Sequence, residues 1–185
     1  MKVLFMGTPD FAVPCLESII KSENNNVIGV VTQPDKPKGR GHKLQPTPVK
    51  AKAVEYNIPV FQPETLKNRS FEDELKQLNP DIIVVVAYGQ ILPEYILNFP
   101  KFGCINVHAS LLPKYRGAAP IQWSVINGDT TTGVTTMYMA KGLDSGDMIL
   151  KAEEKIKDDD TYGTLYDRLS YIGADLLIKT LDLIE

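Results

Sequence analysis

The sequence has little cysteine, little histidine and no long apolar run among its 185 residues. Its two cysteines, Cys15 and Cys104, lie among apolar neighbours and lack the spacing of a metal site or a CxxC motif. We therefore expect two reduced thiols in the core, as suits a reducing cytosol. No stretch approaches the roughly 20 apolar residues of a membrane-spanning helix, so we expect a soluble, cytoplasmic protein.

An excess of charge of one sign is also missing, because 20 lysines and arginines face 23 aspartates and glutamates. The net charge of -3 gives no general reason to expect a polyanionic partner. Contact with a nucleic acid would therefore need a local basic patch. The length and the hydrophobic fraction of 43% suit one folded domain.

The glycine-rich motif of dinucleotide-binding folds is absent from the place where it would stand. The first apolar run, 2–7, is followed by Thr8-Pro9-Asp10 instead of further glycines. Proline lacks a backbone donor and aspartate repels phosphate, so this segment argues against NAD binding. A plain strand-to-helix turn, with Asp10 as the helix cap, explains the segment without any ligand.

Short β-branched runs alternate with segments of helical period, which predicts an α/β fold. We expect a Rossmann-like, mostly parallel sheet with helices on both faces. The run 81–89 is apolar throughout and should be central, whereas prolines confine 58–63 to an edge. Segment 33–47 is the longest without periodic structure. The expected strands are 2–7, 27–33, 58–63, 81–89, 103–108, 133–140 and 147–156, the last two as a hairpin. The expected helices follow Asp10, cover 48–56 and 70–78, and end the chain after a cap at Thr161.

Two polar residues, Asn106 and His108, end the apolar run 103–108. The period of a strand places both side chains on one face of the sheet. An amide N–H can stabilise a developing oxyanion, and an imidazole can take or give a proton near neutral pH. The simpler alternative is that both side chains only satisfy backbone groups at the strand end.

A carboxylate that could join this pair lies in the glycine-bounded loop between 133–140 and 147–156. Asp144 would orient His108 if that loop folds over the same crevice. Asp147 competes for the role, and an aspartate that only makes the turn is the plain alternative. Ligands of open α/β sheets bind beyond the carboxyl ends of the strands, which points to 7–10, 88–89, 106–108 and the loop around Asp144.

The segment from Pro34 to Lys50 carries a local excess of cations and several prolines. Such a loop could contact phosphates and become ordered when a partner binds, or it could be a solvated basic loop. Its cations are Lys36, Lys38, Arg40, Lys43 and Lys50, against Asp35.

Taken together, these segments closely resemble the N-terminal catalytic domain of the methionyl-tRNA formyltransferases, over almost the whole chain. The matching stretches are "MGTPDFAVPCL", "VVTQPDKPKGRGHKLQPTPVK", "PVFQPETL", "DIIVVVAYGQILP", "GCINVHASLLPKYRGAAPIQWSVINGD" and "TGVTTMYMAKGLDSGDM". The wider family of 10-formyltetrahydrofolate-dependent enzymes shares the Asn-x-His, the distant aspartate and often an "SLLP"-like turn. The resemblance implies the formyltransferase fold and transfer of a formyl group from 10-formyltetrahydrofolate to the α-amine of methionyl initiator tRNA.

The resemblance also implies roles for residues. Asn106, His108 and Asp144 would be the catalytic set, and Phe11 would help to form a methionine pocket. Neither a metal nor NAD is implied, because the folate co-substrate already carries the activated one-carbon unit. Folate would contact Ser110, Leu111, Leu112 and Pro113, with Tyr88 and Gly89 as a wall. The tRNA would contact Lys38, Arg40, His42 and Lys43.

Members of this family usually continue into a second, β-barrel domain that binds tRNA, whereas this sequence ends at Glu185. We therefore expect 1–185 to be a single, monomeric catalytic domain that binds folate but uses tRNA poorly. The alternatives are a formyltransferase acting on a sugar-nucleotide amine, a formyltetrahydrofolate hydrolase, or a nucleic-acid-binding module without enzymatic activity.

Overall fold

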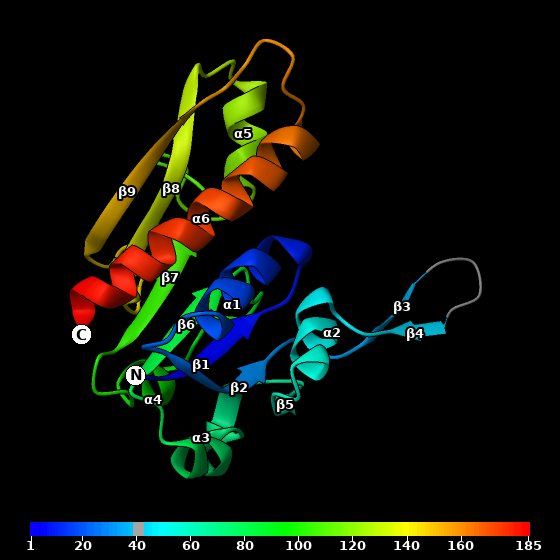
Figure 1. Ribbon diagram of the computed structural model, residues 1–185, viewed down its shortest axis with the longest axis vertical. Coiled ribbons are helices and arrows are strands. Elements are labelled where there is room, and N and C mark those ends of the chain that lie inside the picture. The colour runs from blue at the N-terminus through cyan, green and yellow to red at the C-terminus, as the bar shows by residue number, and fades with distance from the viewer. Residues whose placement is uncertain (39–42) are drawn as a thin grey trace.

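The computed structural model describes residues 1–38 and 43–185, which contain a seven-stranded sheet (Figure 1). Counted from one edge, the first five strands run parallel to one another. The sixth strand, β8, is antiparallel to the fifth, and the seventh, β9, is antiparallel to β8. This confirms the mostly parallel sheet, the edge position of 58–63 and the hairpin of the last two strands. In spatial order the strands are β5 (Val60–Phe61), β2 (Asn26–Val31), β1 (Lys2–Gly7), β6 (Ile82–Val86), β7 (Cys104–His108), β8 (Thr131–Tyr138) and β9 (Met148–Lys155).

Helices cover both faces of the sheet, as predicted. In β6, Ile82 and Val84 join one apolar cluster, whereas Ile83 and Val85 join the other. This alternation explains the unbroken apolar run, because a central strand between two layers has no wet face. The first cluster includes residues of α1 (Val13–Ile20), α2 (Pro48–Glu55), α5 (Pro120–Ile126) and α6 (Tyr162–Ile184), and the second includes residues of α3 (Glu72–Leu78) and α4 (Glu94–Leu97).

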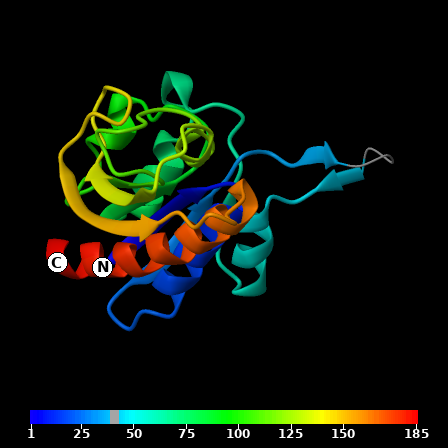
Figure 2. The same ribbon diagram turned by 90° about the horizontal axis from the view of Figure 1, so that it is seen from above.

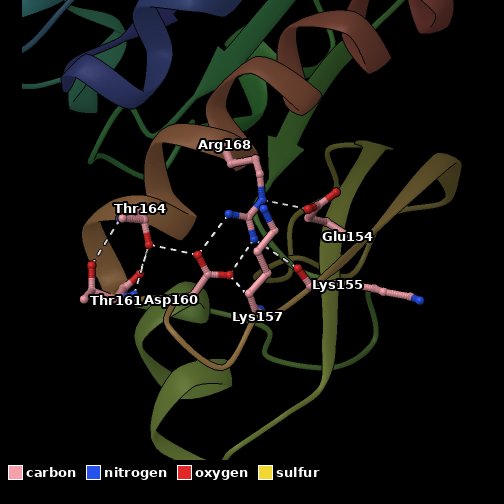
Figure 3. A network of polar contacts seen from close by, with 7 residues as sticks. All are labelled: Glu154, Lys155, Lys157, Asp160, Thr161, Thr164 and Arg168. Carbon is pink, nitrogen blue, oxygen red and sulfur yellow. Dashed lines mark hydrogen bonds and ion pairs between the residues drawn. The ribbon is translucent and has the colours of Figure 1, made fainter.

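The long helix α6 begins at the predicted cap. The Thr161 hydroxyl accepts from the Thr164 amide at 3.3 Å, and the Thr164 hydroxyl accepts from the Thr161 amide at 3.0 Å. Beside this capping box, Arg168 binds Asp160 and Glu154 and thereby ties the loop and β9 to the helix (Figure 3). The Arg168 guanidinium holds the pKa of Asp160 well below its usual range.

The predicted cap at Asp10 is wrong. Asp10 lies inside a 3-10 helix, η1 (Asp10–Ala12), and neither η1 nor α1 has a side-chain cap. Its carboxylate instead accepts from the Tyr166 hydroxyl at 2.5 Å and from the Phe11 amide at 3.2 Å. Because Tyr166 lies 156 residues further along the chain, no local pattern could show this contact.

The segment 33–47 is more regular than predicted. It contains the antiparallel strands β3 (Lys36–Lys38) and β4 (Lys43–Gln45), which form a ribbon that projects from the body (Figures 1 and 2). A two-stranded ribbon tolerates Pro37, because an outer edge needs no backbone donor. At its base Asp35 binds Lys50 at 2.6 Å and accepts from the Gln62 amide at 2.6 Å, so the charge of Lys50 is compensated.

Both cysteines are free and buried, as predicted for core thiols. Burial raises the pKa of Cys15 and of Cys104 to about 12, so each remains a neutral thiol. Within the described parts of the chain, no helix has the length and apolar character needed to cross a membrane.

Candidate active site

A cavity of about 580 Å³ opens at the carboxyl ends of β1, β6 and β7. It receives residues from all four places to which the strand-end rule pointed. Its wall also has an apolar part and an aromatic part. The residues of the four predicted places in its lining are Pro9, Tyr88, Gly89, Asn106, Val107, His108, Leu143 and Asp144.

Strand β7 presents Asn106 and His108 to the cavity, because alternate residues face opposite sides of the sheet. The residues before and between them, Ile105 and Val107, belong to an apolar core cluster, and Val107 also contributes to the cavity lining. The strand therefore holds the polar pair on a rigid element with little freedom of rotation.

The carboxylate of Asp144 reaches both residues of this pair. Its Oδ1 lies 3.5 Å from Asn106 Nδ2, and its Oδ2 lies 3.7 Å from His108 Nδ1. The side chains of His108 and Asp144 are only 9% and 11% exposed, so solvent screens the contact between them little. The distance of 3.7 Å exceeds a direct hydrogen bond, so the two groups are held close without a direct hydrogen bond between them.

Asp147, the alternative carboxylate, does not join the site. Asp147 is exposed, and its backbone carbonyl accepts from the Tyr138 amide at 2.8 Å. Of the two aspartates, Asp144 lies against the polar pair and lines the cavity, and Asp147 does not.

The loop that carries Asp144 folds back over the crevice from the far end of β7. Because β8 runs antiparallel to β7, Tyr138 at its end pairs with Ile105, and Thr135 pairs with His108. The loop 139–147 therefore starts away from the carboxyl end of β7 and folds back towards it. Asp144 has a φ of 46°, a left-handed conformation that aspartate tolerates better than most residues.

Two backbone groups that sequence reasoning missed complete the arrangement. The Tyr115 carbonyl lies 2.9 Å from His108 Nε2, and the Gly117 amide donates to Asp144 Oδ2 at 2.7 Å. A carbonyl can only accept, so Nε2 carries the hydrogen and Nδ1 faces Asp144. Every residue type has these backbone groups, so the sequence holds no signal for them.

The six predicted folate contacts divide into two groups. Tyr88 and Gly89 line the cavity, whereas the segment 110–113 is not part of its lining. The Ser110 hydroxyl donates to the Lys114 carbonyl at 2.6 Å, and the Leu112 amide donates to the Thr135 hydroxyl at 3.1 Å. Ser110, Leu111, Leu112 and Pro113 thus belong to the turn after β7, and their contact with folate stays a prediction.

The apolar part of the wall comes largely from the two predicted loops, the one around Tyr88 and Gly89 and the one around Asp144. Ile91 and Leu143 are 85% and 70% exposed although both are large and apolar, and both line the cavity. Apolar walls around a few polar groups are typical of sites for small, flat ligands. Val85, Ala87 and Met139 complete this part of the lining.

The aromatic part of the wall contains Phe11 together with two tyrosines of α6. The ring of Phe11 meets that of Tyr166 edge-on at 5.2 Å, and Tyr162 lies 5.4 Å from Tyr166. Phe11, Tyr162 and Tyr166 thus line the cavity together, and the role of Phe11 in a methionine pocket stays a prediction.

Two of the four predicted tRNA contacts, Lys38 and Lys43, belong to the strands of the projecting ribbon. Lys38 and Lys43 pair across the two strands. Arg40 and His42 lie outside the described residues. Within residues 1–38 and 43–185, no group of three or more His, Cys, Asp or Glu side chains could hold a metal ion.

Solved structures share this fold at low sequence identity. A phosphoribosylglycinamide formyltransferase from Bacillus halodurans has a TM-score of 0.80 at 24% identity, over 98% of this chain and 93% of that one. A formyltetrahydrofolate deformylase from Pseudomonas syringae has a TM-score of 0.78 at 19% identity, over 97% and 59%. These likenesses confirm the predicted formyltransferase fold.

Sequence relatives are much closer. The chain is 62% identical over 185 residues to a methionyl-tRNA formyltransferase of Alkaliphilus oremlandii, and 63% identical to one of Clostridioides difficile. In both comparisons all of this chain is covered, and it spans 59% and 60% of the relatives' length. The protein-family model described as "Formyl transferase" matches residues 1–181 of this chain. The chain therefore belongs to the formyl transferase family.

Proposed function

We propose that this chain carries the site that transfers the formyl group of 10-formyltetrahydrofolate to the α-amine of methionyl initiator tRNA. The observation that supports it most is the meeting of Asn106, His108 and Asp144 at one cavity. The names of the close relatives support the choice of acceptor.

The reaction forms one bond and breaks one. The amine nitrogen attacks the formyl carbon, and the carbonyl oxygen gains negative charge in a tetrahedral intermediate. The bond from carbon to N10 of the folate then breaks. One proton leaves the amine and one reaches N10, so the products are a formamide and tetrahydrofolate, with no oxidant or metal in the balance.

The three side chains divide the work. The Asn106 amide donates to the developing oxyanion, as does His108 when its Nδ1 is protonated. Asp144 stabilises the charged imidazole and accepts the proton that the amine releases. Because Nε2 is bound to the Tyr115 carbonyl, Nδ1 is the nitrogen of His108 that exchanges protons with the site.

The two parts of the wall suit the two substrates. The apolar part, with Ile91 and Leu143, fits the flat pterin ring of the folate. The aromatic part, with Phe11, fits a methionine thioether, since sulfur packs favourably at ring edges. Lys38 and Lys43 of the ribbon, with Arg40 and His42 between them in sequence, would approach the phosphates of the tRNA.

Substitution of the polar pair tests this proposal. We expect Asn106→Ala and His108→Ala each to lower kcat for formylation by ~10²–10³-fold, the usual effect of losing an oxyanion donor or a proton carrier. The assay follows transfer from 10-formyltetrahydrofolate to methionyl-tRNA by the full-length protein. Thermal unfolding of each variant checks that the fold is kept.

Asn24→Ala serves as the matched control, because Asn24 is exposed and outside the cavity lining. It should keep the parental rate. Near-parental turnover by Asn106→Ala or His108→Ala would refute the role of that residue. Formyl release to water with no formylated tRNA would favour a hydrolase instead.

A further inference from the structure

The turn from Tyr115 to Gly117 contacts two members of the candidate catalytic set at once. Its first residue accepts from His108 Nε2 through a carbonyl, and its last donates to Asp144 Oδ2 through an amide. The spacing between His108 and Asp144 therefore depends on where this turn lies. Gly117 suits the position, since its φ of 88° is accessible to glycine at little cost.

The backbone conformation of Tyr115 needs a stabilising contact. Its φ is 57°, a left-handed conformation that is rare for a bulky residue. The side chain is anchored at its tip, where the hydroxyl donates to Asp129 Oδ2 at 2.7 Å and accepts from Asn127 Nδ2 at 2.9 Å. Asp129 in turn binds Lys114 Nζ at 2.8 Å.

Asp129 is well suited to hold the anchor. Its side chain is 16% exposed, whereas that of Lys114 is 55% exposed. The Lys114 ammonium and the Tyr115 hydroxyl keep the pKa of Asp129 below its usual range, so it remains an ionised acceptor. A charged acceptor makes a stronger hydrogen bond to a hydroxyl than a neutral one does.

We propose that Asp129, acting through the Tyr115 hydroxyl, is a positioning residue that fixes the tautomer of His108. The anchor holds the Tyr115 carbonyl against Nε2, so that the hydrogen of the neutral ring stays on Nε2 and Nδ1 remains free towards Asp144. Asp129 touches no reacting atom. The inference rests on the proposed function for its catalytic meaning, but the tautomer itself is independent of any substrate.

Two variants remove the anchor from different sides. Tyr115→Phe deletes only the hydroxyl and keeps the backbone carbonyl, and Asp129→Ala deletes its acceptor. Lys114→Met is the matched control, because it removes the other partner of Asp129 and leaves the bond to Tyr115 intact. Thermal unfolding confirms that each variant is folded.

The first readout is the nitrogen NMR spectrum of the imidazoles, recorded at a pH at which the rings are neutral. The 185 residues contain two histidines, His42 and His108, so His108→Ala assigns the signals. We expect a single Nε2–H tautomer for His108 in the parent and in Lys114→Met. In Tyr115→Phe and Asp129→Ala we expect a mixture of tautomers, while the signal of His42 stays unchanged.

The second readout is the rate. We expect kcat in the two anchor variants to fall about tenfold, the equivalent of one lost hydrogen bond, with KM for both substrates unchanged. An unchanged tautomer in both anchor variants would overturn the inference. If the anchor variants shift the tautomer but the parent protein transfers no formyl group, the positioning role would be upheld and the proposed function refuted.

Discussion

At the scale of single residues, Asp144 combines a charge with an unusual backbone. Asparagine tolerates the left-handed conformation as aspartate does, and its carbonyl oxygen can still accept from the Gly117 amide. Asp144→Asn therefore removes the charge and leaves the loop in place. We expect kcat for formylation to fall by ~10² or more, as for loss of a proton-transfer group, with little change in unfolding temperature.

Asp147→Asn is the control for this prediction, since Asp147 is exposed in the same loop and takes no part in the cavity lining. It should retain the parental kcat. If Asp144→Asn kept the parental kcat as well, the carboxylate would have no part in the chemistry. If Asp144→Asn unfolded at a markedly lower temperature, the charge would serve the fold instead.

The residues of the site differ in how well a sequence can reveal them. Asn106 and His108 were predictable, because strand period and chemical type both point to them. Asp144 could be named but not chosen over Asp147, because the choice depends on how a loop folds back. For the segment 110–113 the resemblance implied a folate-binding role, but it could not show whether these residues line the cavity, and they are not part of its lining.

At the scale of secondary structure, the start of α6 depends on an ion pair beside its capping box (Figure 3). Arg168 lowers the pKa of Asp160, so ionised Asp160 stabilises the fold above the ordinary carboxyl pKa of about 4. That stabilisation is lost as the pH falls through the depressed value. We expect Asp160→Asn to lower the free energy of unfolding at pH 7, with the difference from the parent shrinking below about pH 4.

Urea denaturation at pH 7, 5 and 3 measures this difference. Asp159→Asn is the neighbouring control, because Asp159 is exposed. It should match the parent at each pH. An Asp160→Asn deficit of equal size at pH 3 and pH 7 would show that the side chain acts by something other than its charge.

Element boundaries and caps show where local patterns are reliable. The cap at Thr161 was predicted correctly, because a capping box is complete within four residues. The cap at Asp10 was wrong, because its carboxylate is bound by a tyrosine from the other end of the chain. The ribbon of β3 and β4 was missed, because only one proline of the segment, Pro37, lies within its strands, and an edge strand tolerates it.

At the scale of the whole molecule, the ribbon projects away from the body (Figure 2). If it contacts tRNA, its charges should affect the tRNA and not the folate. We expect Arg40→Ala combined with Lys43→Ala to raise KM for methionyl-tRNA several-fold and to make its salt dependence shallower by about one unit per lost phosphate contact. Hydrolysis of 10-formyltetrahydrofolate should be unaffected.

Lys67→Ala provides the control, because Lys67 is exposed but lies outside the ribbon. It should leave KM and its salt dependence at the parental values. Equal loss of tRNA formylation and folate hydrolysis in the ribbon variant would place these residues in the catalytic site and not on a tRNA-binding surface.

The sheet as a whole was only partly predictable. The apolar run of β6 identified a central strand, but no pattern showed that β1 would lie between β2 and β6. Strand order depends on which helices cross which face, and this is decided by packing over long distances. The antiparallel β8 likewise determines the path of the Asp144 loop, and only the register shows it.

The contact between Asp10 and Tyr166 also has a consequence for biosynthesis. One wall of the cavity comes from the beginning of the chain, and its neighbour comes from the last helix. A polypeptide still emerging from the ribosome can form the early strands, but its cavity remains incomplete until Tyr166 has left the exit tunnel. This wall of the cavity therefore forms only after the whole of α6 has been synthesised.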